Sequence, residues 1–132
     1  MAFIRCGGGT ATLKATTLWT NSSPSSSFAN QTISLSSTSN YDYIKITWRW
    51  STSDSTDFIS IFPKNQYSGG KRLAIGGAPD VNTTARYRFW TQASSYSEMG
   101  WSNSVQHTSS SQTTSGAYVI PTKIEGLKLE TI

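Results

Sequence analysis

The chain has few of the residues that usually supply covalent cross-links or catalysis. Cys6 is its only cysteine and His107 its only histidine in 132 residues. A single cysteine excludes an internal disulfide and any zinc site built from several cysteines. We therefore expect a protein that folds without oxidation, which fits assembly in a bacterial cytoplasm.

Charged residues are also scarce, at 14% of the chain, against about a quarter in an average globular domain. Ser and Thr fill much of this gap, at about three in ten residues. This composition is typical of β-rich extracellular or virion proteins, because Thr favours the pleated surface of a sheet and Ser favours turns. Five Trp, six Tyr and five Phe provide ample core material and argue against disorder.

Long apolar runs are missing as well. No window approaches the ~20 apolar residues of a membrane span. The first residues lack the apolar stretch of a signal peptide. We therefore expect neither a membrane partner nor secretion.

The net charge of +4 raises the question of nucleic-acid binding. The eleven Lys and Arg residues are scattered, however, and tight groups occur only at Lys71 with Arg72 and at Arg86 with Arg88. No signature of a nucleic-acid-binding module accompanies them. We predict no specific nucleic-acid binding, whereas attraction to anionic cell-wall polymers would use the same charge.

Catalytic motifs are not found. His107 stands in a polar stretch, and the chain has no Gly-x-Ser-x-Gly elbow to pair with it, so we interpret it as a surface or hydrogen-bonded residue. Asp54 and Asp57 flank a Ser/Thr turn, where Asp commonly bonds its own backbone, and this favours turn chemistry over a glycosidase pair or a metal site. We predict no enzyme, no metal site and no cofactor.

What the sequence does contain is alternation of apolar and polar residues. The clearest case is 42–50, in which Ile44, Ile46, Trp48 and Trp50 fall on one face. A period of two over nine residues, rich in β-branched and aromatic side chains, predicts a half-buried strand. Further strands are predicted at 16–20, 31–35, 57–62, 72–75, 84–90, 99–105 and 117–123, the last continuing weakly to 129.

About eight short strands, with turn clusters between them and no helical stripe, predict an all-β fold. We expect an antiparallel β-sandwich of jelly-roll type over 12–132, with a barrel as the alternative. Residues 1–11 are predicted to form a flexible arm, because a run of glycines has no side chains to pack. The arm is either a frayed terminus or a segment that attaches to a neighbouring subunit through Phe3, Ile4, Gly7, Gly8 and Gly9.

Aromatic residues are the remaining source of binding chemistry, since their rings stack on sugar faces. In the predicted strand 84–90, Arg86, Arg88 and Trp90 share one face. If Tyr87 and Phe89 point inward, Trp90 points outward beside two cations. A slip of one residue would instead bury Trp90 and expose the two other rings.

Two further rings lie in predicted loops beside Ser and Gly, a composition typical of adaptable binding surfaces. Trp101 aligns with Met99 and is assigned to the core, as are Trp48 and Trp50. An indole between guanidinium groups suits acidic or phosphorylated sugars, because the cations pair with the anion while the ring stacks. The predicted ligand-binding residues are Trp90, Arg86, Arg88, Tyr67 and Tyr96.

Three segments carry a resemblance to a known group of proteins. They are Leu18-Trp19-Thr20-Asn21 with the following Pro24, Phe28-Ala29 and Ile33-Ser34-Leu35; Tyr41-Asp42-Tyr43-Ile44; and Ile120-Pro121-Thr122-Lys123-Ile124-Glu125-Gly126-Leu127-Lys128. Together they resemble the β-sandwich domains of tail tips and fibres from tailed bacteriophages of Gram-positive gut bacteria. The resemblance implies a virion structural protein, often trimeric, with surface recognition at the distal end and no catalytic residue.

Two functions therefore stand as alternatives. The first is a tail-fibre or baseplate component that binds a host-surface glycan. The second is a purely structural virion subunit, such as a capsid decoration or head-fibre protein, which contacts only other virion proteins. A bacterial carbohydrate-binding module is a third, which the missing secretion signal disfavours.

The oligomeric state is predicted from the aromatic content. The 16 aromatic residues exceed what one core of this size absorbs and, with the fibre resemblance, predict a homo-oligomer, with a trimer favoured.

Overall fold

The computed structural model describes residues 2–6, 9–78 and 84–131. Within these residues the chain forms strands joined by turns and one short helix. The elements are β1 Ala2–Cys6, β2 Gly9–Thr20, β3 Gln31–Ser34, β4 Tyr43–Ser51, β5 Asp57–Pro63, α1 Lys64–Tyr67, β6 Arg72–Gly77, β7 Ala85–Gln92, β8 Glu98–His107, β9 Gln112–Ser115 and β10 Tyr118–Thr131.

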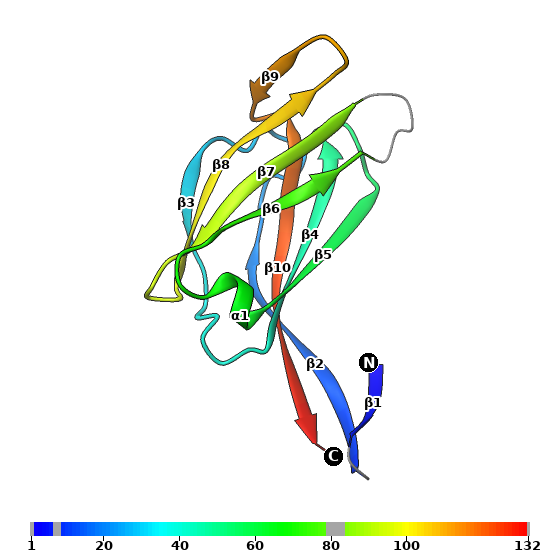
Figure 1. Cartoon of the computed structure of the whole chain (residues 1–132), viewed down its shortest axis with the longest axis vertical. Coiled ribbons are helices and arrows are strands. Elements are labelled where there is room, and N and C mark those ends of the chain that lie inside the picture. Colours follow the sequence, from blue (N-terminus) through cyan, green and yellow to red (C-terminus); the bar gives the residue numbers. More distant parts are fainter. Residues whose placement is uncertain (1, 7–8, 79–83, 132) are drawn as a thin grey trace.

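Two antiparallel sheets pack against each other (Figure 1). Sheet A has the order β1-β2-β10-β4-β5, and sheet B has the order β3-β8-β7-β6, with β9 paired to β8. In sheet A β2 pairs with β10, and in sheet B β3 pairs with β8, so early strands lie beside late ones, as in a rolled-up ribbon. The middle of the chain forms the hairpin β4–β5 and the meander β6–β7–β8. The predicted all-β antiparallel sandwich is confirmed.

Each of the eight predicted strands corresponds to an observed one, namely β2 to β8 and β10. Two elements lie in stretches that were predicted to be turns. β9 is short, polar and largely exposed; it pairs with β8 through backbone groups and through the Ser104 hydroxyl, which donates to the Ser115 carbonyl. α1 is one turn of helix after Pro63, and it has a single buried residue, Tyr67. Neither segment has an apolar period that a sequence pattern could reveal.

The N-terminal segment forms a strand pair in its described part. β1 runs antiparallel to β2, from Ala2 opposite Leu13 to Cys6 opposite Gly9. Residues 2–6 and 9–11 of the arm predicted as flexible therefore belong to strands, because backbone pairing needs no apolar side chains. Gly7 and Gly8 lie outside the described residues. Figure 1 shows this pair extending beyond the body of the sandwich, beside the end of β10.

The core lies between the two sheets and is rich in aromatic residues. In β4 the predicted alternation is confirmed, since Ile44 and Ile46 are fully buried and Trp48 is 4% exposed. The Trp48 indole N–H donates to Ser60 Oγ at 3.0 Å, so its polar atom is satisfied. The buried cluster further includes Leu18, Phe28, Ile33, Leu35, Tyr67, Ile75, Trp90, Met99, Trp101, Val119, Ile120 and Ile124.

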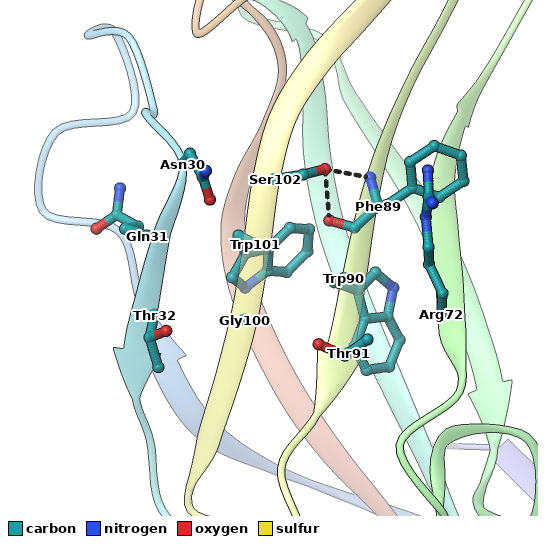
Figure 2. Close-up of a pocket in the computed structure, with 10 residues that line it drawn as sticks. All are labelled: Asn30, Gln31, Thr32, Arg72, Phe89, Trp90, Thr91, Gly100, Trp101 and Ser102. Atoms are coloured by element: carbon teal, nitrogen blue, oxygen red, sulfur yellow. Dashed lines mark hydrogen bonds between the residues drawn. The ribbon is translucent and has the colours of Figure 1, made fainter.

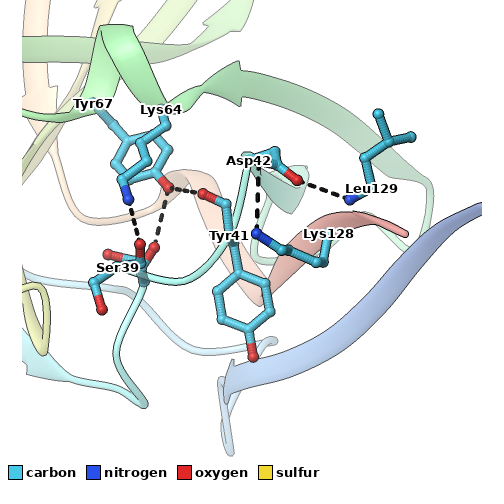
Figure 3. Close-up of polar contacts among 8 residues, drawn as sticks. Ser39, Tyr41, Asp42, Lys64, Tyr67, Lys128 and Leu129 are labelled. Atoms are coloured by element: carbon cyan, nitrogen blue, oxygen red, sulfur yellow. Dashed lines mark hydrogen bonds and ion pairs between the residues drawn. The ribbon is translucent and has the colours of Figure 1, made fainter. Parts of the chain in front are cut away.

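One end of the sandwich is closed by the loops around α1 (Figure 3). The Asp42 carboxylate accepts the Leu129 N–H at 2.8 Å, and the Asp42 carbonyl accepts the Lys64 N–H at 2.9 Å. The Tyr41 ring lies so close to Gly126 of β10 that a Cβ there would stand 2.4 Å from a ring atom. A side chain at this glycine is therefore excluded without local movement.

Candidate ligand-binding groove

β7 decides where the predicted site residues lie. Its side chains alternate, with Arg88 and Trp90 pointing between the sheets, 0% and 1% exposed. Tyr87 and Phe89 are half-buried on the other face. The interpretation that placed Trp90 outward is therefore wrong, and the alternative register holds. Both faces of this strand carry aromatic side chains, so alternation alone does not identify the buried face.

Trp90 is a core residue. Its ring lies edge-on to Phe62 of β5, with ring centres 5.1 Å apart, and it stacks on Trp101 of β8 at 6.1 Å. The contact with Phe62 joins the two sheets, and such aromatic pairs add to the energy of burial. An indole that is 1% exposed has no free face on which a sugar could stack.

Arg88 is a structural residue that ties three segments together. Its guanidinium donates only to backbone carbonyl groups, and the described residues include no ion pair to it. Burial lowers the pKa of Arg88 to about 10, because desolvation penalises the charged form. The carbonyls offset this cost by satisfying the donors of the guanidinium. The acceptors, at 2.7 to 3.4 Å, are Phe28, Ser102, Gly116, Tyr118 and Val119.

The hydrogen bonds of Arg88 hold an unusual backbone conformation at the start of β10. Val119 has a φ of +47°, a left-handed conformation that is unfavourable for a β-branched residue. The Arg88 Nε donates to the Val119 carbonyl at 2.8 Å, and another Arg88 nitrogen reaches the Tyr118 carbonyl at 2.9 Å. The buried cation therefore holds the strained backbone at the start of β10 in place.

Arg86 lies at the rim between the sheets and is half-buried. Its guanidinium carbon stands 3.9 Å from the centre of the Tyr118 ring and 4.7 Å from that of Trp50. The Arg86 Nε donates to the Gln106 side chain at 2.7 Å, and partial burial lowers the pKa of Arg86. Trp50, assigned to the core from the sequence, is half-buried beside it. The three side chains predicted to act together share a face, but it is the inner face, and Trp90 offers no platform there.

Tyr67 and Tyr96 join α1 to the neighbouring loops. The Tyr67 hydroxyl is 3.1 Å from the Thr38 carbonyl and 3.0 Å from the Tyr41 carbonyl, and the residue is fully buried (Figure 3). Burial raises the pKa of Tyr67 to about 12. Tyr96 is half-buried with a φ of +60°, and its hydroxyl lies 3.3 Å from Ser68 Oγ. Tyr96 therefore lies in a loop, between β7 and β8, as predicted, whereas Tyr67 lies in α1, and neither ring is exposed.

The outer face of sheet B carries a groove of about 470 Å³ (Figure 2). Its floor is at Gly100 of β8, which pairs with Thr32 of β3 on one side and with Thr91 of β7 on the other. A Cβ at Gly100 would lie 3.1 Å from Thr91 Oγ1, so the missing side chain creates part of the hollow. The lining residues are Asn30, Gln31, Thr32, Arg72, Phe89, Trp90, Thr91, Gly100, Trp101 and Ser102.

A cation held on an aromatic ring forms one side of the groove. The Arg72 guanidinium carbon lies 3.5 Å from the centre of the Phe89 ring, and Figure 2 shows the two groups in contact. Arg72 is exposed on the edge strand β6, and the described residues include no ion pair to it. The cation–π contact restrains the guanidinium while leaving its N–H donors available.

The outward rings of β7 continue this side of the face. Phe89 meets Tyr87 edge-on at 5.1 Å, and Tyr87 stacks on His107 at 5.5 Å. The Tyr87 hydroxyl and the His107 Nε2 are 2.8 Å apart. His107 is therefore hydrogen-bonded, as its sequence context predicted.

A β-bulge shapes the middle of the groove. Between two paired positions, β8 has Ser102 and Asn103 where β7 has only Phe89. Ser102 Oγ lies 3.2 Å from both the N and the O of Phe89, as Figure 2 shows, and so replaces the interrupted backbone pairing. The Asn103 side-chain oxygen accepts the Asn30 N–H at 2.9 Å. Bulges of this kind redirect side chains and often lie beside binding sites.

The opposite side carries the exposed Asn30 amide and the Thr32 side chain. Asn30 directly precedes β3 and lies across the groove from Arg72 in Figure 2, whereas the amide of Gln31, the first residue of β3, points away from the groove and donates to the Ala29 carbonyl. An amide, a guanidinium and an aromatic ring within one open hollow are the groups that hydrogen-bond sugar hydroxyls, pair with anions and contact apolar C–H surface. This set was not predicted from the sequence. Its signals were the Lys71–Arg72 group and the isolated Gly100 within a strand, which often marks a close backbone approach.

The two acidic residues considered from the sequence lie in ordinary polar contacts. Asp54 Oδ2 accepts the Ser51 hydroxyl at 3.1 Å within a turn, and Asp57 pairs with Arg49 at 3.2 Å. Across the part of the chain that the structure describes, no three His, Cys, Asp or Glu residues form a group that could hold a metal ion. The helix in the same residues is too short to cross a membrane.

Comparisons of the chain with protein-family models, with curated proteins and with solved structures found no match. The similarity to phage tail domains stays a prediction from the three sequence segments between Leu18 and Lys128. The groove is interpreted from its own geometry.

Proposed function

We propose that the protein is a structural component of a tailed-bacteriophage virion, in a tail fibre or baseplate, and that it binds an anionic host-surface glycan in the groove on sheet B. The sequence resemblance supports the virion part. The observation that carries the glycan part is the exposed Arg72 guanidinium, held 3.5 Å above the Phe89 ring and without an ion pair among the described residues.

In this proposal each side of the groove has its own role. Arg72 pairs with a phosphate or carboxylate of the polymer through two parallel N–H donors. The Asn30 amide on the opposite side, three strand spacings of about 4.8 Å away, hydrogen-bonds a hydroxyl group of a neighbouring sugar in the same polymer. Gly100 lets the sugar approach the sheet backbone between Thr32 and Thr91.

The test compares polymers and variants by isothermal titration. The probes are purified wall teichoic acid, a carboxylated polysaccharide and neutral dextran. Arg72→Gln should weaken binding to the anionic probes at least about tenfold. Lys71→Gln is the matched control, because it removes the same charge from an exposed neighbour that does not line the groove. Equal losses in the two variants would indicate diffuse charge attraction and contradict the groove.

The virion part has a separate test. An antibody raised against the protein should label purified particles of the phage that encodes it, at the tail tip or baseplate in electron micrographs. Labelling of the capsid alone would contradict the tail location, and a complete absence of the protein from purified particles would contradict the virion assignment.

A purely structural subunit is the second candidate, and a specific observation favours it. Ile59 and Ile61 of β5 are 56% and 52% exposed on the outer face of sheet A. Neighbouring apolar side chains exposed on one strand are typical of a surface that contacts another protein. This function predicts incorporation into particles with no binding to any of the three polymers.

A further inference from the structure

β5 is an edge strand with an unpaired outer side. It ends the order of sheet A, and within the described residues it pairs only with β4. Edge strands are usually protected by charges, prolines, bulges or short length. In β5 the only charge is Asp57 at one end and the only proline is Pro63 at the other, and the pairing with β4 has no bulge.

The backbone groups of β5 alternate between its two sides. Tyr43 pairs with Pro63, and the Lys64 N–H donates to the Asp42 carbonyl at 2.9 Å. Even-numbered residues of β5 therefore direct N–H and C=O toward β4, and odd-numbered residues direct them outward. Ile59 and Ile61 have outward N–H and C=O groups, while Pro63, which has no N–H, lies where no donor to β4 is needed.

The sequence between the two ends of β5 reads the same in both directions: Phe58-Ile59-Ser60-Ile61-Phe62. In a two-fold contact the same patch must complement itself, with residue i facing j and j facing i. An antiparallel pair of β5 strands centred on Ser60 would place like residue types opposite each other at every position from 58 to 62. The outward N–H and C=O groups fall in the register that such a pair requires.

We propose that a second copy of this chain docks on the edge of β5, antiparallel and about a two-fold axis at Ser60. Ile59 of one copy then exchanges N–H and C=O bonds with Ile61 of the second copy, and the reverse. The four isoleucine side chains form one apolar cluster on the outer face, because opposite residues of a ladder lie on the same face. Sheet A becomes continuous across the two copies. This two-fold contact is independent of the groove and differs from the trimer that the phage resemblance implies.

Light scattering measures the assembly directly. At about 100 μM, where micromolar contacts are saturated, the wild-type mass should be twice that of the 14.4 kDa chain. Ile61→Pro removes an outward N–H from each copy and leaves the bonds to β4, so it should weaken the dimer about 30-fold or more. Leu129→Lys is the control, because Leu129 is an exposed apolar residue outside β5 and its variant should keep the wild-type mass.

Hydrogen exchange gives a residue-level signature. In the wild type at high concentration, the amides of Ile59 and Ile61 should be protected together with those of Phe58, Ser60 and Phe62. On dilution to monomer, only the two isoleucine amides should lose protection, because the other three bond to β4. If Ile61→Pro lowers the melting temperature, Ile61→Lys replaces it, since an exposed side chain there tolerates a charge.

Four results would overturn the proposal. The first is a monomeric mass at about 100 μM, because a chain that stays monomeric there associates more weakly than specific dimers do. The second is fast exchange of the Ile59 and Ile61 amides in a wild-type oligomer, and the third is an oligomer whose mass and stability are unchanged by both Ile61 variants. The fourth is a trimeric mass, which contradicts the two-fold contact.

Discussion

The outer faces of the two sheets differ in how their basic residues are paired. On sheet A, the Glu125 carboxylate lies 3.7 Å from the Lys45 ammonium and 3.5 Å from that of Lys123. On sheet B, Arg72 lies against the Phe89 ring, and the described residues include no acid partner for it. Basic groups already paired with an acid attract an added anion weakly, whereas a ring-held guanidinium keeps its donors available. The arrangement of the cations decides which face suits an anionic ligand.

The apolar side chains show the opposite distribution. On sheet A, Ile59 and Ile61 are more than half exposed at the edge. On sheet B, the outward rings Tyr87 and Phe89 are half-buried, since His107 and Arg72 lie against them. Our two proposals follow this difference, since they place a second copy of the chain on the edge of sheet A and an anionic glycan on sheet B.

Replacing Arg88 should have the largest effect on the free energy of unfolding, because this residue is buried between the two sheets. Arg88→Met leaves buried carbonyls without donors and removes the hydrogen bond that holds the left-handed backbone at Val119. We expect the free energy of unfolding to fall by about 3–5 kcal/mol, as measured by urea denaturation. Arg86→Met is the control and should cost about 1 kcal/mol, since Arg86 is half-buried. Equal losses would show that the hydrogen bonds of Arg88 have no special role.

One glycine in each sheet tests the difference between the two sheets. Gly126→Ala in sheet A should lower the free energy of unfolding by about 2–3 kcal/mol, because its Cβ meets the Tyr41 ring. Gly100→Ala in sheet B meets only the Thr91 hydroxyl, so we expect less than about 1 kcal/mol. The second variant should nevertheless weaken binding of teichoic acid, because it fills the groove floor. Loss of teichoic-acid binding in Gly126→Ala, together with unchanged binding in Gly100→Ala, would contradict the location of the binding site on sheet B.

The smallest effect on the free energy of unfolding is expected for Tyr67, which lies at the end of the sandwich where loops join the two sheets. Its pKa is raised from 10.0 to about 12, mainly by burial, so the fold favours the neutral phenol. The stability that this group contributes is complete below pH 10 and is lost as the pH rises toward 12. The free energy of unfolding of the wild type should fall more steeply between these values than that of Tyr67→Phe. Parallel curves would show that the buried phenol is not linked to stability.

The strands were predictable because their signal is local. In β4 the alternation of Ile44, Ile46 and Trp48 is visible in nine consecutive residues, and burial follows it. β9 and α1 were missed because a polar strand and a single helical turn have no apolar period. The pairing of β1 with β2 was missed for a related reason, since backbone bonding there does not depend on side-chain pattern.

The candidate site was less predictable, because its parts come from different strands. Gly100 becomes a floor only when β3 places Thr32 on one side and β7 places Thr91 on the other. Arg72 is an ordinary exposed cation until the β6–β7 register brings it over Phe89. No local pattern contains these pairings.

The sequence by itself determined the sandwich, because a period of two, repeated between turn clusters, leaves few other ways to bury apolar side chains. Only the tertiary structure decided which face of β7 is inside, since both faces carry rings that could fill the core. This places Arg88 where carbonyl groups from β8, from the start of β10 and from the loop before β3 satisfy its donors. Those carbonyls are distant in the chain, and a buried charge is stable only when all of them meet it at once.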